Sequence, residues 1–597
     1  MFIIRYQTVR YRPDLVVTIR NNVDGWQEEL GGVYENDAWS FRLDSARYVN
    51  GVAFKFVLEG QYWMEGGNLF LQPTPGGVYT FGAGQVVFPP IGELLVENGF
   101  FQQRFFPPNL DQNHEYDVIV VGSGVGGGIL ADQLADLGLD VLVLEAGSYL
   151  VPSHVGNLPR QHALAPRIDK HIWHLWDDFK VTNYVNGPGS AYQGGQGFNL
   201  GGRSVFWGGL IPRMSWWELE TWPQEVRWYL EDHGYALAEE LLKRTQLDSD
   251  YQRQVRSELT RSFPDYVVMG APMAVQHSLP QLNTIPAGIF STADLLLESR
   301  LTGGPSGNQN LTVNLNHAAV QLLTEGGRAT GVLAHDLIAD TPRSYRGRAV
   351  VLAAGTVESA KLALLSGLND PSGTLGAGIT DHPIFFTHFA LPAGAPLHRV
   401  DAAAKLLLQH RDARVEAGPP RAYHHRYNMV LELGADFNQG RFVDPELLAA
   451  AVAARNGLML CELVFLFDAP LVAGNGLAQP GPSFVKPVVN MQEPPITPAE
   501  WAEINALRAA VLGQLGAIPL PGGNLDLVRA PMGGVAHEVG TLRMGEQGVL
   551  DANLKFRAYQ NLYACDLSVF PSSPAANPTL TLAALALRLA THLRGTL

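Results

Sequence analysis

Short runs in which hydrophobic and polar residues alternate fill the first 90 positions of the chain. The clearest runs lie at residues 15–19, 39–43, 52–58 and 69–71, and turn-forming clusters separate them. A period of two places the apolar side chains on one face of a β-strand. Because several such strands follow one another at regular spacing, the pattern predicts an all-β sandwich module over residues 1–90.

The pattern changes at residue 116, where one complete βαβ unit begins. Residues 118–121 and 141–144 are continuous apolar runs, which are typical of parallel strands buried on both faces. Residues 128–137 lie between them and predict a helix, which Gly138 ends. Two parallel strands joined by a helix predict an α/β fold of the Rossmann type.

A glycine-rich turn at residues 122–127 joins the first strand to this helix. Gly122 permits the tight turn, Gly124 lets the backbone approach a pyrophosphate, and Gly127 lets the helix pack close to the strand. Glu145 follows the second strand, 21 residues beyond Gly124, where a carboxylate can bind ribose hydroxyls. Together these features predict dinucleotide binding, and both FAD and NAD fit this unit.

A second βα element lies at residues 349–365. The apolar run 349–352 predicts a strand that ends in a glycine turn at Gly355, and residues 359–365 predict the helix that Thr356 or Glu358 opens. A glycine turn before a helix is again a place where a helix N-terminus can meet a cofactor. Farther along, the turn at residues 380–383 carries His382, which we interpret as a structural histidine.

The region between about 384 and 530 is predicted to carry an antiparallel layer. Residues 460–467 alternate as one strand of such a sheet would. Residues 498–515 predict a helix with Thr497 as its N-cap and Pro498 at its first position.

Length and composition narrow the class of protein. A chain of 597 residues is expected to form two to four domains, and with 46% hydrophobic and 17% charged residues it has a globular composition. The net charge of -15 argues against nucleic acid or an anionic membrane surface as a partner. No apolar segment reaches the length of a transmembrane helix, and the first residues do not resemble a secretory signal. Only Cys461 and Cys565 occur, so we expect buried, reduced thiols and a cytoplasmic location.

Aromatic residues gather in two places. Residues 91–115 contain four phenylalanines beside two prolines and predict a linker that packs on a neighbour. Seven of the eleven tryptophans lie between residues 150 and 230; such a density is more typical of a core, and a sugar-stacking cavity is the alternative. Between those tryptophans, Gly201, Gly202, Gly208 and Gly209 leave little side-chain bulk, so that the backbone can press against a flat ligand.

The last 65 residues carry the candidate chemistry. His537 lies in a glycine-flanked loop, and Asn577-Pro578 precedes an apolar helix predicted at residues 579–593. Asn577 also fits a purely structural role, because asparagine is a favoured N-cap and proline a favoured first helical residue. Beside a dinucleotide fold, however, a histidine can take the proton of an alcohol while an amide holds its oxygen. We expect no metal ion at this site.

Several blocks of the sequence resemble the glucose-methanol-choline (GMC) oxidoreductase family, whose members are flavin enzymes that oxidise alcohols. The blocks are the βαβ unit with EAG at 145–147, GGRS at 201–204, LAAGTVESAKLALLSG at 352–367, HEVGTLRMG at 537–545 and NLYACDLSVFPSSPAANPTLT at 561–581. The resemblance implies a Rossmann-like FAD-binding domain with an interleaved antiparallel substrate domain. It makes His537 the catalytic base and Asn577 its partner. The cofactor contacts that it implies are Gly122, Gly124, Gly127, Glu145, Gly201, Gly202, Ser204, Phe206, Trp207, Gly355, Asp566 and Pro578.

Within that family the GG-x-S-x-x-W block and the His/Asn pair are most similar to the pyranose oxidase branch. This likeness implies hydride transfer from a sugar carbinol to N5 of the flavin, with oxygen or another acceptor taking the electrons afterwards. Fungal members of the branch carry a histidine just before the tryptophan, joined covalently to FAD, where this chain has Phe206. A phenyl ring cannot form that bond, so we expect FAD to be dissociable.

The N-terminal module loosely resembles starch-binding carbohydrate modules. The likeness rests on Trp26, Trp39 and the stretch at residues 54–69, in which Trp63 and Asn68 would contact a glycan. The same residues can instead simply close the sandwich, and a role of the module in docking or self-association is equally open.

These observations give one division of the chain and one main function. The predicted segments are a β-sandwich module at 1–90, a linker at 91–115, FAD-binding parts at 116–215, 301–380 and 531–597, and substrate-domain parts at 216–300 and 381–530. The function expected is FAD-dependent oxidation of a sugar carbinol. The alternatives are oxidation of an apolar or aliphatic alcohol, an NAD-dependent dehydrogenase, and a non-catalytic protein that binds flavin and glycan.

Overall fold

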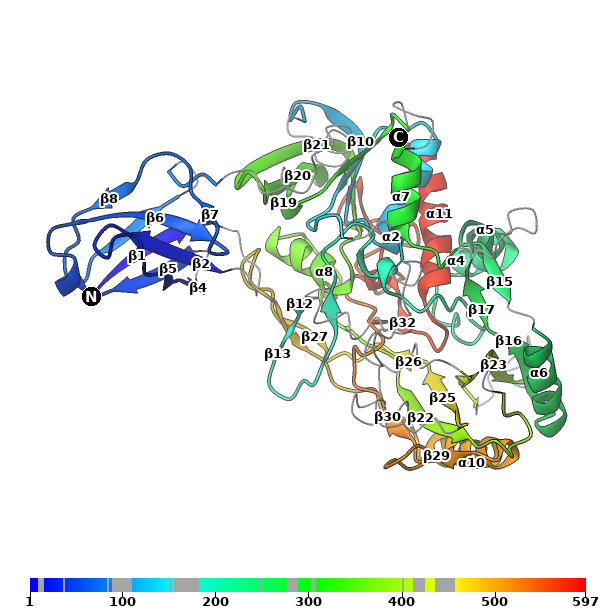
Figure 1. Cartoon of the computed structure of the whole chain (residues 1–597). Coiled ribbons are helices and arrows are strands. Elements are labelled where there is room, and N and C mark those ends of the chain that lie inside the picture. Colours follow the sequence, from blue (N-terminus) through cyan, green and yellow to red (C-terminus); the bar gives the residue numbers. More distant parts are fainter. Residues whose placement is uncertain are drawn as a thin grey trace.

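The computed structural model describes residues 1–8, 16–35, 38–82, 85–88, 110–150, 153–154, 182–246, 249–275, 288–301, 308–399, 402–411, 425–434 and 457–597. They form an N-terminal β module, an α/β body and a separate antiparallel sheet (Figure 1). The predicted fold class is confirmed in all three parts. The predicted boundaries between the FAD-binding and substrate segments stay predictions.

The N-terminal module is a sandwich of two sheets, with strand orders β4-β5-β1-β9 and β3-β2-β6-β7, and β8 beside β6. Fully buried aromatic side chains, among them Phe41, Phe54 and Phe56, fill the space between the sheets. The strands predicted at 39–43, 52–58 and 69–71 are confirmed. The bounds are β1 Phe2–Gln7, β2 Val17–Asn21, β3 Leu30–Gly31, β4 Val33–Glu35, β5 Ala38–Leu43, β6 Val52–Leu58, β7 Tyr62–Trp63, β8 Leu69–Leu71 and β9 Val78–Phe81.

The α/β body is built on a seven-stranded sheet with the order β18-β11-β10-β21-β20-β19, in which β31 also pairs with β21. Strands β18, β11, β10, β21 and β31 are parallel, while β20 and β19 run antiparallel beside them. The bounds are β10 Glu115–Val121, β11 Val141–Leu144, β18 Leu311–Asn314, β19 His317–Glu325, β20 Arg328–Asp336, β21 Thr341–Leu352 and β31 Leu562–Ala564.

Helices of this body meet the strands where the glycine turns were predicted. Helix α2, Val125–Asp136, follows β10 and begins three residues earlier than expected, with Gly124 as its N-cap. Helix α8, Thr356–Leu365, follows β21 with Gly355 as its N-cap. The helices α7, Thr292–Leu301, and α11, Thr579–Thr596, lie against α2.

The start of α11 corrects one prediction. Pro578, not Asn577, occupies the N-cap position, and no side-chain hydrogen bond caps the helix. Asn577 therefore precedes the cap, although the helix begins at Thr579 as predicted. The capping role that explained Asn577 structurally is thus wrong.

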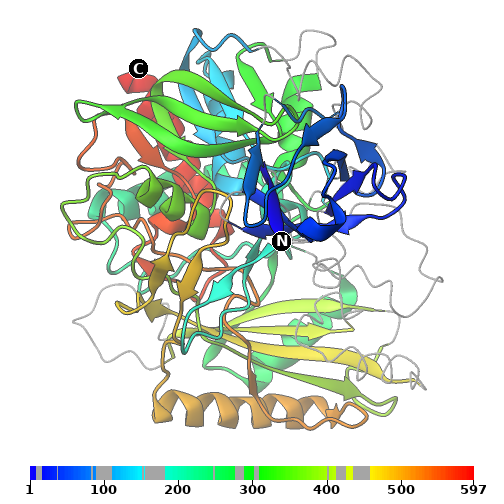
Figure 2. The ribbon, with the colours of Figure 1, turned by 90° about the vertical axis from the view of Figure 1, so that its left-hand side faces the viewer.

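The antiparallel sheet has the order β16-β23-β24-β25-β22-β29, with β30 also beside β22. The predicted helix α10, Pro498–Leu515, is confirmed with its N-cap Thr497, whose hydroxyl accepts a hydrogen bond from the amide of Glu500 in a capping box. Figure 2 shows α10 lying along one face of this sheet. The bounds are β16 Tyr266–Gly270, β22 Ile384–Leu391, β23 Ala404–His410, β24 Tyr427–Leu433, β25 Met459–Phe467, β29 Ile518–Pro519 and β30 Val528–Arg529.

Some predictions concern residues outside the described ranges. They include most of the linker at 91–115 with its four phenylalanines, and Trp173 and Trp176. Among the described tryptophans, Trp217 and Trp222 are buried in the core as predicted, whereas Trp228 is 61% exposed and belongs to neither core nor cavity. Cys461 and Cys565 are free and buried, as expected. No helix within the described ranges is long and apolar enough to span a bilayer.

Candidate active site

A cavity of about 1000 Å³ lies where the α/β body, the antiparallel sheet and the β module meet. Its wall contains most of the residues that the sequence nominated, namely Gly122, Gly124, Glu145, Gly202, Ser204, Phe206, Trp207, Gly355, His537, Asp566 and Asn577. Gly127, Gly201 and Pro578 are not part of the wall. The structure thus brings together residues that lie up to 455 positions apart in the chain.

The glycine turn has the shape that a dinucleotide requires. A Cβ on Gly126 would lie 1.9 Å from the carbonyl oxygen of Cys565, and one on Gly127 would lie 2.1 Å from that of Gly122. These glycines therefore allow α2 to press against its neighbours. Gly124 differs, because nothing lies within 4 Å of the position of its Cβ and the residue faces the cavity. Open space beside a glycine at a helix N-terminus fits a pyrophosphate.

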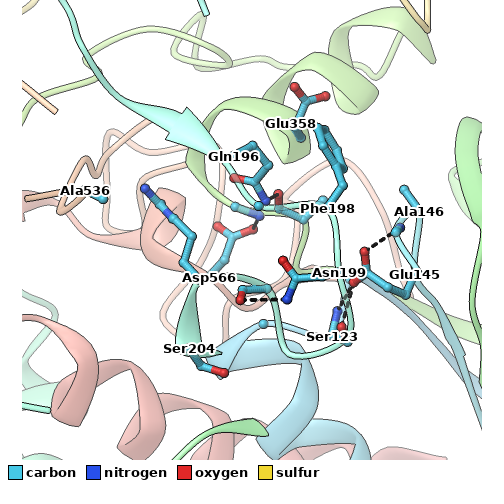
Figure 3. A pocket seen from close by; sticks show the side chains of 18 of the residues that line it. Ser123, Glu145, Ala146, Gln196, Phe198, Asn199, Ser204, Glu358, Ala536 and Asp566 are labelled. Atoms are coloured by element: carbon cyan, nitrogen blue, oxygen red, sulfur yellow. Dashed lines mark hydrogen bonds between the residues drawn. The ribbon is translucent and has the colours of Figure 1, made fainter. Parts of the chain in front are cut away.

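Glu145 holds the glycine turn in place. Its carboxylate accepts hydrogen bonds from the backbone N–H of Ser123 at 3.0 Å, from the Ser123 hydroxyl at 2.6 Å and from the N–H of Gly147 at 2.8 Å. Burial raises the pKa of this carboxyl, and the hydrogen bonds partly oppose that shift. Figure 3 shows Glu145 directed at Ser123 in the wall of the cavity. A ribose contact of Glu145 stays a prediction.

The GGRS block packs directly on this turn. The N–H of Gly201 donates to the Ser123 hydroxyl at 2.9 Å, and a Cβ on Gly202 would lie 3.3 Å from the Cα of Gly124. The Ser204 hydroxyl donates to the carbonyl of Gly201 at 2.6 Å and accepts from the N–H of Thr292 at 3.0 Å. Ser204 therefore ties the block to α7, and its contact with a cofactor stays a prediction.

Asp566 holds the N-terminus of α8 from inside the cavity wall. Its carboxylate accepts hydrogen bonds from the N–H of Gly355 at 2.9 Å and from the hydroxyl of Ser359 at 2.5 Å. Burial raises the pKa of Asp566. Gly355 itself has a φ of 90°, a left-handed conformation that favours glycine.

His537 lies in the cavity wall against a second histidine, His382. Nδ1 of His537 is 3.0 Å from Nε2 of His382, whose side chain is buried. The preceding residue, Ala536, has a φ of 59°, a conformation that costs free energy in a residue other than glycine and that sets the direction of the loop. The interpretation of His382 as merely structural is therefore incomplete, because its ring contacts the candidate base directly.

A buried network fixes the loop that carries His537. Arg203 forms an ion pair with Glu538 at 2.9 Å, and the hydroxyl of Tyr192 also donates to Glu538. The N–H groups of His382 and Gly533 donate to Asp381, each at 2.9 Å. Burial and the nearby Glu538 raise the pKa of Asp381 to about 7.

Sequence reasoning missed Arg203, Glu538 and Asp381. A signal existed for two of them, since Arg203 lies inside the GGRS block and Glu538 follows His537. Each of the two glycine-rich motifs contains a charged residue, and the two charges are opposite. Because buried charges are usually paired, this arrangement indicates an ion pair between the motifs.

Asn577 reaches the cavity through a loop that a buried acid positions. The N–H of Ala576 donates to the carboxylate of Glu218 at 2.7 Å, and the N–H of Ser215 donates to it at 2.6 Å. Burial raises the pKa of Glu218 to about 8, although these hydrogen bonds favour its charged form. Asn577 and His537 thus line the same cavity, and their catalytic roles stay a prediction.

The antiparallel sheet adds charged side chains to the wall of the cavity. Lys405, Glu432 and Glu462 lie in the wall, beside Val430 and Val464. Nζ of Lys405 is 2.5 Å from Glu432, and Nε2 of His388 is 3.1 Å from Glu462. We call these four charged or titratable residues the ionic row: Lys405, Glu432, Glu462 and His388.

Two models of the GMC oxidoreductase family match the chain, at residues 302–384 and 517–586. A C-glycoside 3-oxidase from Microbacterium trichothecenolyticum is 25% identical over 529 residues, which cover 80% of this chain and 96% of that protein. Other relatives match over shorter stretches. Paromamine 6'-oxidase from Streptomyces fradiae is 33% identical over 140 residues, which are 22% of each protein, and a long-chain-alcohol oxidase from Arabidopsis thaliana is 55% identical over 49 residues, 7% of each.

Among solved structures, pyridoxine 4-oxidase from Mesorbium loti superposes with a TM-score of 0.55 at 18% sequence identity, covering 80% of this chain and 99% of the other. At this identity the likeness concerns the fold. The two family models, by contrast, cover segments that build the cavity: Gly355 and α8 lie in the first, and His537, Asp566 and Asn577 lie in the second. The segments that build the cavity thus match the GMC oxidoreductase family, and the cofactor is FAD.

Proposed function

We propose that the protein oxidises a carbinol of a sugar or of a sugar-containing substrate, with His537 as the base. The observation that carries the proposal is the position of His537, which shares a cavity wall with Asn577 and with the glycine turn that fits a dinucleotide. FAD supplies the redox chemistry when bound, because its flavin accepts a hydride from the carbinol carbon.

Residues of the chain would accept the proton, orient the alcohol and bind the cofactor. Since Nδ1 of His537 faces His382, the proton of the alcohol would pass to Nε2. The amide of Asn577 would hold the alcohol oxygen and orient its C–H bond. Gly122, Gly124 and the amides at the start of α2 would hold the pyrophosphate, and Glu145 the ribose.

The polarity of the cavity supports a sugar over an aliphatic alcohol. A pocket for apolar substrates would be lined by tryptophans and would lack partners for hydroxyl groups. Here Trp207 is the one tryptophan among the described wall residues, whereas Lys405, Glu432 and Glu462 offer donors and acceptors for hydroxyls. The C-glycoside 3-oxidase relative, by its name, also acts on a glycoside.

The test is anaerobic bleaching of the flavin across a panel of monosaccharides, glycosides and aliphatic alcohols, followed by admission of air. We expect sugars or glycosides to bleach the flavin and His537→Ala to slow that bleaching by about 10²-fold to 10⁴-fold. Bleaching by aliphatic alcohols alone would favour the apolar alternative. A protein that needs added nicotinamide would be an NAD-dependent dehydrogenase, and flavin that stays oxidised with every compound would reject catalysis. Return of the yellow colour in air would identify oxygen as an acceptor.

We also propose that FAD is held without a covalent bond. Phe206 is buried in the cavity wall at the position where fungal pyranose oxidases carry the flavin-linked histidine. Acid precipitation should therefore leave yellow flavin in the supernatant. Flavin that stays in the washed pellet would contradict this proposal.

The predicted role of the N-terminal module, the predicted location and the predicted absence of other partners stay predictions. Trp63 is half-buried between Trp26, with ring centroids 6.2 Å apart, and the guanidinium of Arg20, 5.4 Å from the ring centre. This packing suits the interpretation that Trp63 helps to close the sandwich, and glycan binding or self-association through the module is a separate prediction. A cytoplasmic location and the absence of nucleic-acid and membrane partners rest on the composition of the sequence.

A further inference from the structure

The turn between β6 and β7 of the N-terminal module reaches the wall of the cavity. Four of its residues line that wall: Leu58, Glu59, Gln61 and Tyr62. The N–H of Gln61 donates to the carbonyl of Leu58 at 3.1 Å. The two residues between them have positive φ angles, 53° at Glu59 and 69° at Gly60. These features are typical of a type I′ hairpin turn, which holds the tip in one conformation.

The module docks on the connection between β20 and β21. The hydroxyls of Tyr6 and Thr8 both donate to Asp340 in this connection, each at 2.7 Å. Leu337 and Ile338 of the same connection line the cavity. Figure 1 shows the module beside the hairpin of β19 and β20, with β7 on the side nearest the α/β body. The β6–β7 turn and this connection therefore border the same part of the cavity.

Backbone hydrogen bonds join this part of the cavity to Glu145. The N–H of Leu337 donates to the carbonyl of Asn316 at 2.8 Å, and the N–H of Asn316 donates to the carbonyl of Gly147 at 3.0 Å. The N–H of His317 donates to the carbonyl of Glu145 at 2.9 Å, and all five residues line the cavity. The acid that follows the second strand of a Rossmann unit marks the ribose end of a dinucleotide. The β6–β7 turn thus borders the place expected for the adenosine half of FAD.

Two side chains of the turn offer groups that suit an adenine ring. The side chain of Gln61 is exposed, and that of Tyr62 is half-buried. Within the described part of the chain, neither the amide group of Gln61 nor the hydroxyl of Tyr62 forms a hydrogen bond. An aromatic side chain can stack on a base, and a carboxamide can both donate to and accept from the edge of an adenine.

We propose that the β6–β7 turn covers the adenosine end of the FAD site. Tyr62 packs on the adenine ring, and the amide group of Gln61 binds the edge of that ring. The inference goes beyond the proposed function, because it concerns the cofactor and holds for any alcohol substrate. It gives the module a function that suits this chain, since Phe206 cannot bind the flavin covalently and other contacts must retain it.

The test compares three ligands that contain different parts of FAD. ADP has the adenosine end with the pyrophosphate, FMN has the flavin end without adenosine, and FAD has both. After FAD has been removed from the full-length protein, flavin fluorescence gives the Kd of FAD and of FMN, and competition with FAD gives that of ADP. Dilution of the holoenzyme gives the rate of FAD release.

Both variants of the turn should lose affinity for the adenosine end alone. We expect Tyr62→Ala to weaken FAD and ADP about tenfold to 100-fold, as for the loss of base stacking, and Gln61→Ala to weaken them about threefold to tenfold. FAD release should accelerate in the same proportion, and FMN binding should change less than twofold. Phe70→Ala is the matched control, because Phe70 is an aromatic residue of the module that is 65% exposed and lies outside the cavity wall.

Unchanged binding of FAD and ADP in both variants would overturn the proposal. Equal weakening of FAD and FMN would also overturn it, since FMN has no adenosine for the turn to bind. Thermal melts of the FAD-free proteins show whether the module still folds. If Tyr62→Ala unfolds it, Gln61→Ala decides, because that side chain is exposed. No sugar enters these measurements, so their failure differs from failure of the proposed function, in which no sugar reduces the bound flavin.

Discussion

His382 is the residue whose role the structure changes most. Its Nε2 lies 3.0 Å from Nδ1 of His537 and can fix the tautomer and the ring orientation of the candidate base. We expect His382→Gln to lower the rate of flavin reduction about tenfold and to shift the pKa that the pH-rate profile reports for the base. A purely structural role would lower stability without moving the profile. His398→Gln, at a half-buried histidine that does not line the cavity, is the control for a general effect of losing an imidazole.

The raised pKa of Glu218 predicts how the stability of the protein depends on pH. Its pKa is raised to about 8 by burial, so between pH 4.5 and 8 the folded state binds more protons than the unfolded state. In that window the contribution of Glu218 to stability is lost as the pH rises. Glu218→Gln removes this loss, and its melting temperature relative to the unmodified protein should increase from pH 5 to pH 8. Melting curves at four pH values check this, and a difference that is independent of pH would contradict it.

From the sequence, single candidate residues could be nominated where a motif surrounded them. Pairs of residues that contact each other only in the folded protein were missed. His537 and Asn577 stood beside glycine and proline signals that suggested a cofactor site. Arg203 and Glu538 are 335 positions apart, and the one sequence signal for their pairing is that each lies in a glycine-rich motif. The ionic row was missed for the same reason, because its register depends on how four separate strands pair.

At the scale of elements, two glycines at the start of α2 have different roles. Gly126 permits close contact within the protein, since a Cβ there would lie 1.9 Å from a carbonyl oxygen, whereas Gly124 borders open space in the cavity. We expect Gly126→Ala to lower the melting temperature of the FAD-free protein. Gly124→Ala should leave that temperature nearly unchanged and weaken FAD binding at least tenfold, because the methyl group would occupy space meant for the pyrophosphate.

Each alanine variant is the control for the other, because both add one methyl group, at the N-cap of α2 and two residues later. Thermal melts without FAD and fluorescence titrations with FAD give the two quantities. If Gly124→Ala bound FAD normally, the open space beside Gly124 would not be the place of the cofactor.

Elements with strong local signals were predictable, and a side-chain cap made the N-cap of α10 predictable as well. The capping box at Thr497 and Glu500 fixed the start of α10 correctly. The start of α2 was misplaced by three residues, and the N-cap of α11 by one, because neither helix has a side-chain cap: Gly124 and Pro578 occupy those positions.

At the scale of the whole molecule, the N-terminal module contributes to the wall of the cavity. Leu58, Glu59, Gln61 and Tyr62, at the turn between β6 and β7, line the same cavity as Glu145. The sequence predicted the module and the cavity separately, but it could not place one against the other. Docking between modules depends on surface contacts that leave no periodic pattern in the chain.

One buried contact anchors this arrangement and gives the last prediction. The hydroxyls of Tyr6 and Thr8 in the module both donate to the same carboxylate oxygen of Asp340, each at 2.7 Å. Hydrogen bonds to a charged group contribute about 1.5–3 kcal/mol each, so the nearly isosteric double variant Tyr6→Phe/Thr8→Val should loosen the module and release FAD about tenfold faster. Recovery of flavin fluorescence after dilution measures the release. Tyr79→Phe, whose hydroxyl bonds within the module, should leave the rate unchanged, and an unchanged rate in the double variant would show that the module does not retain the cofactor.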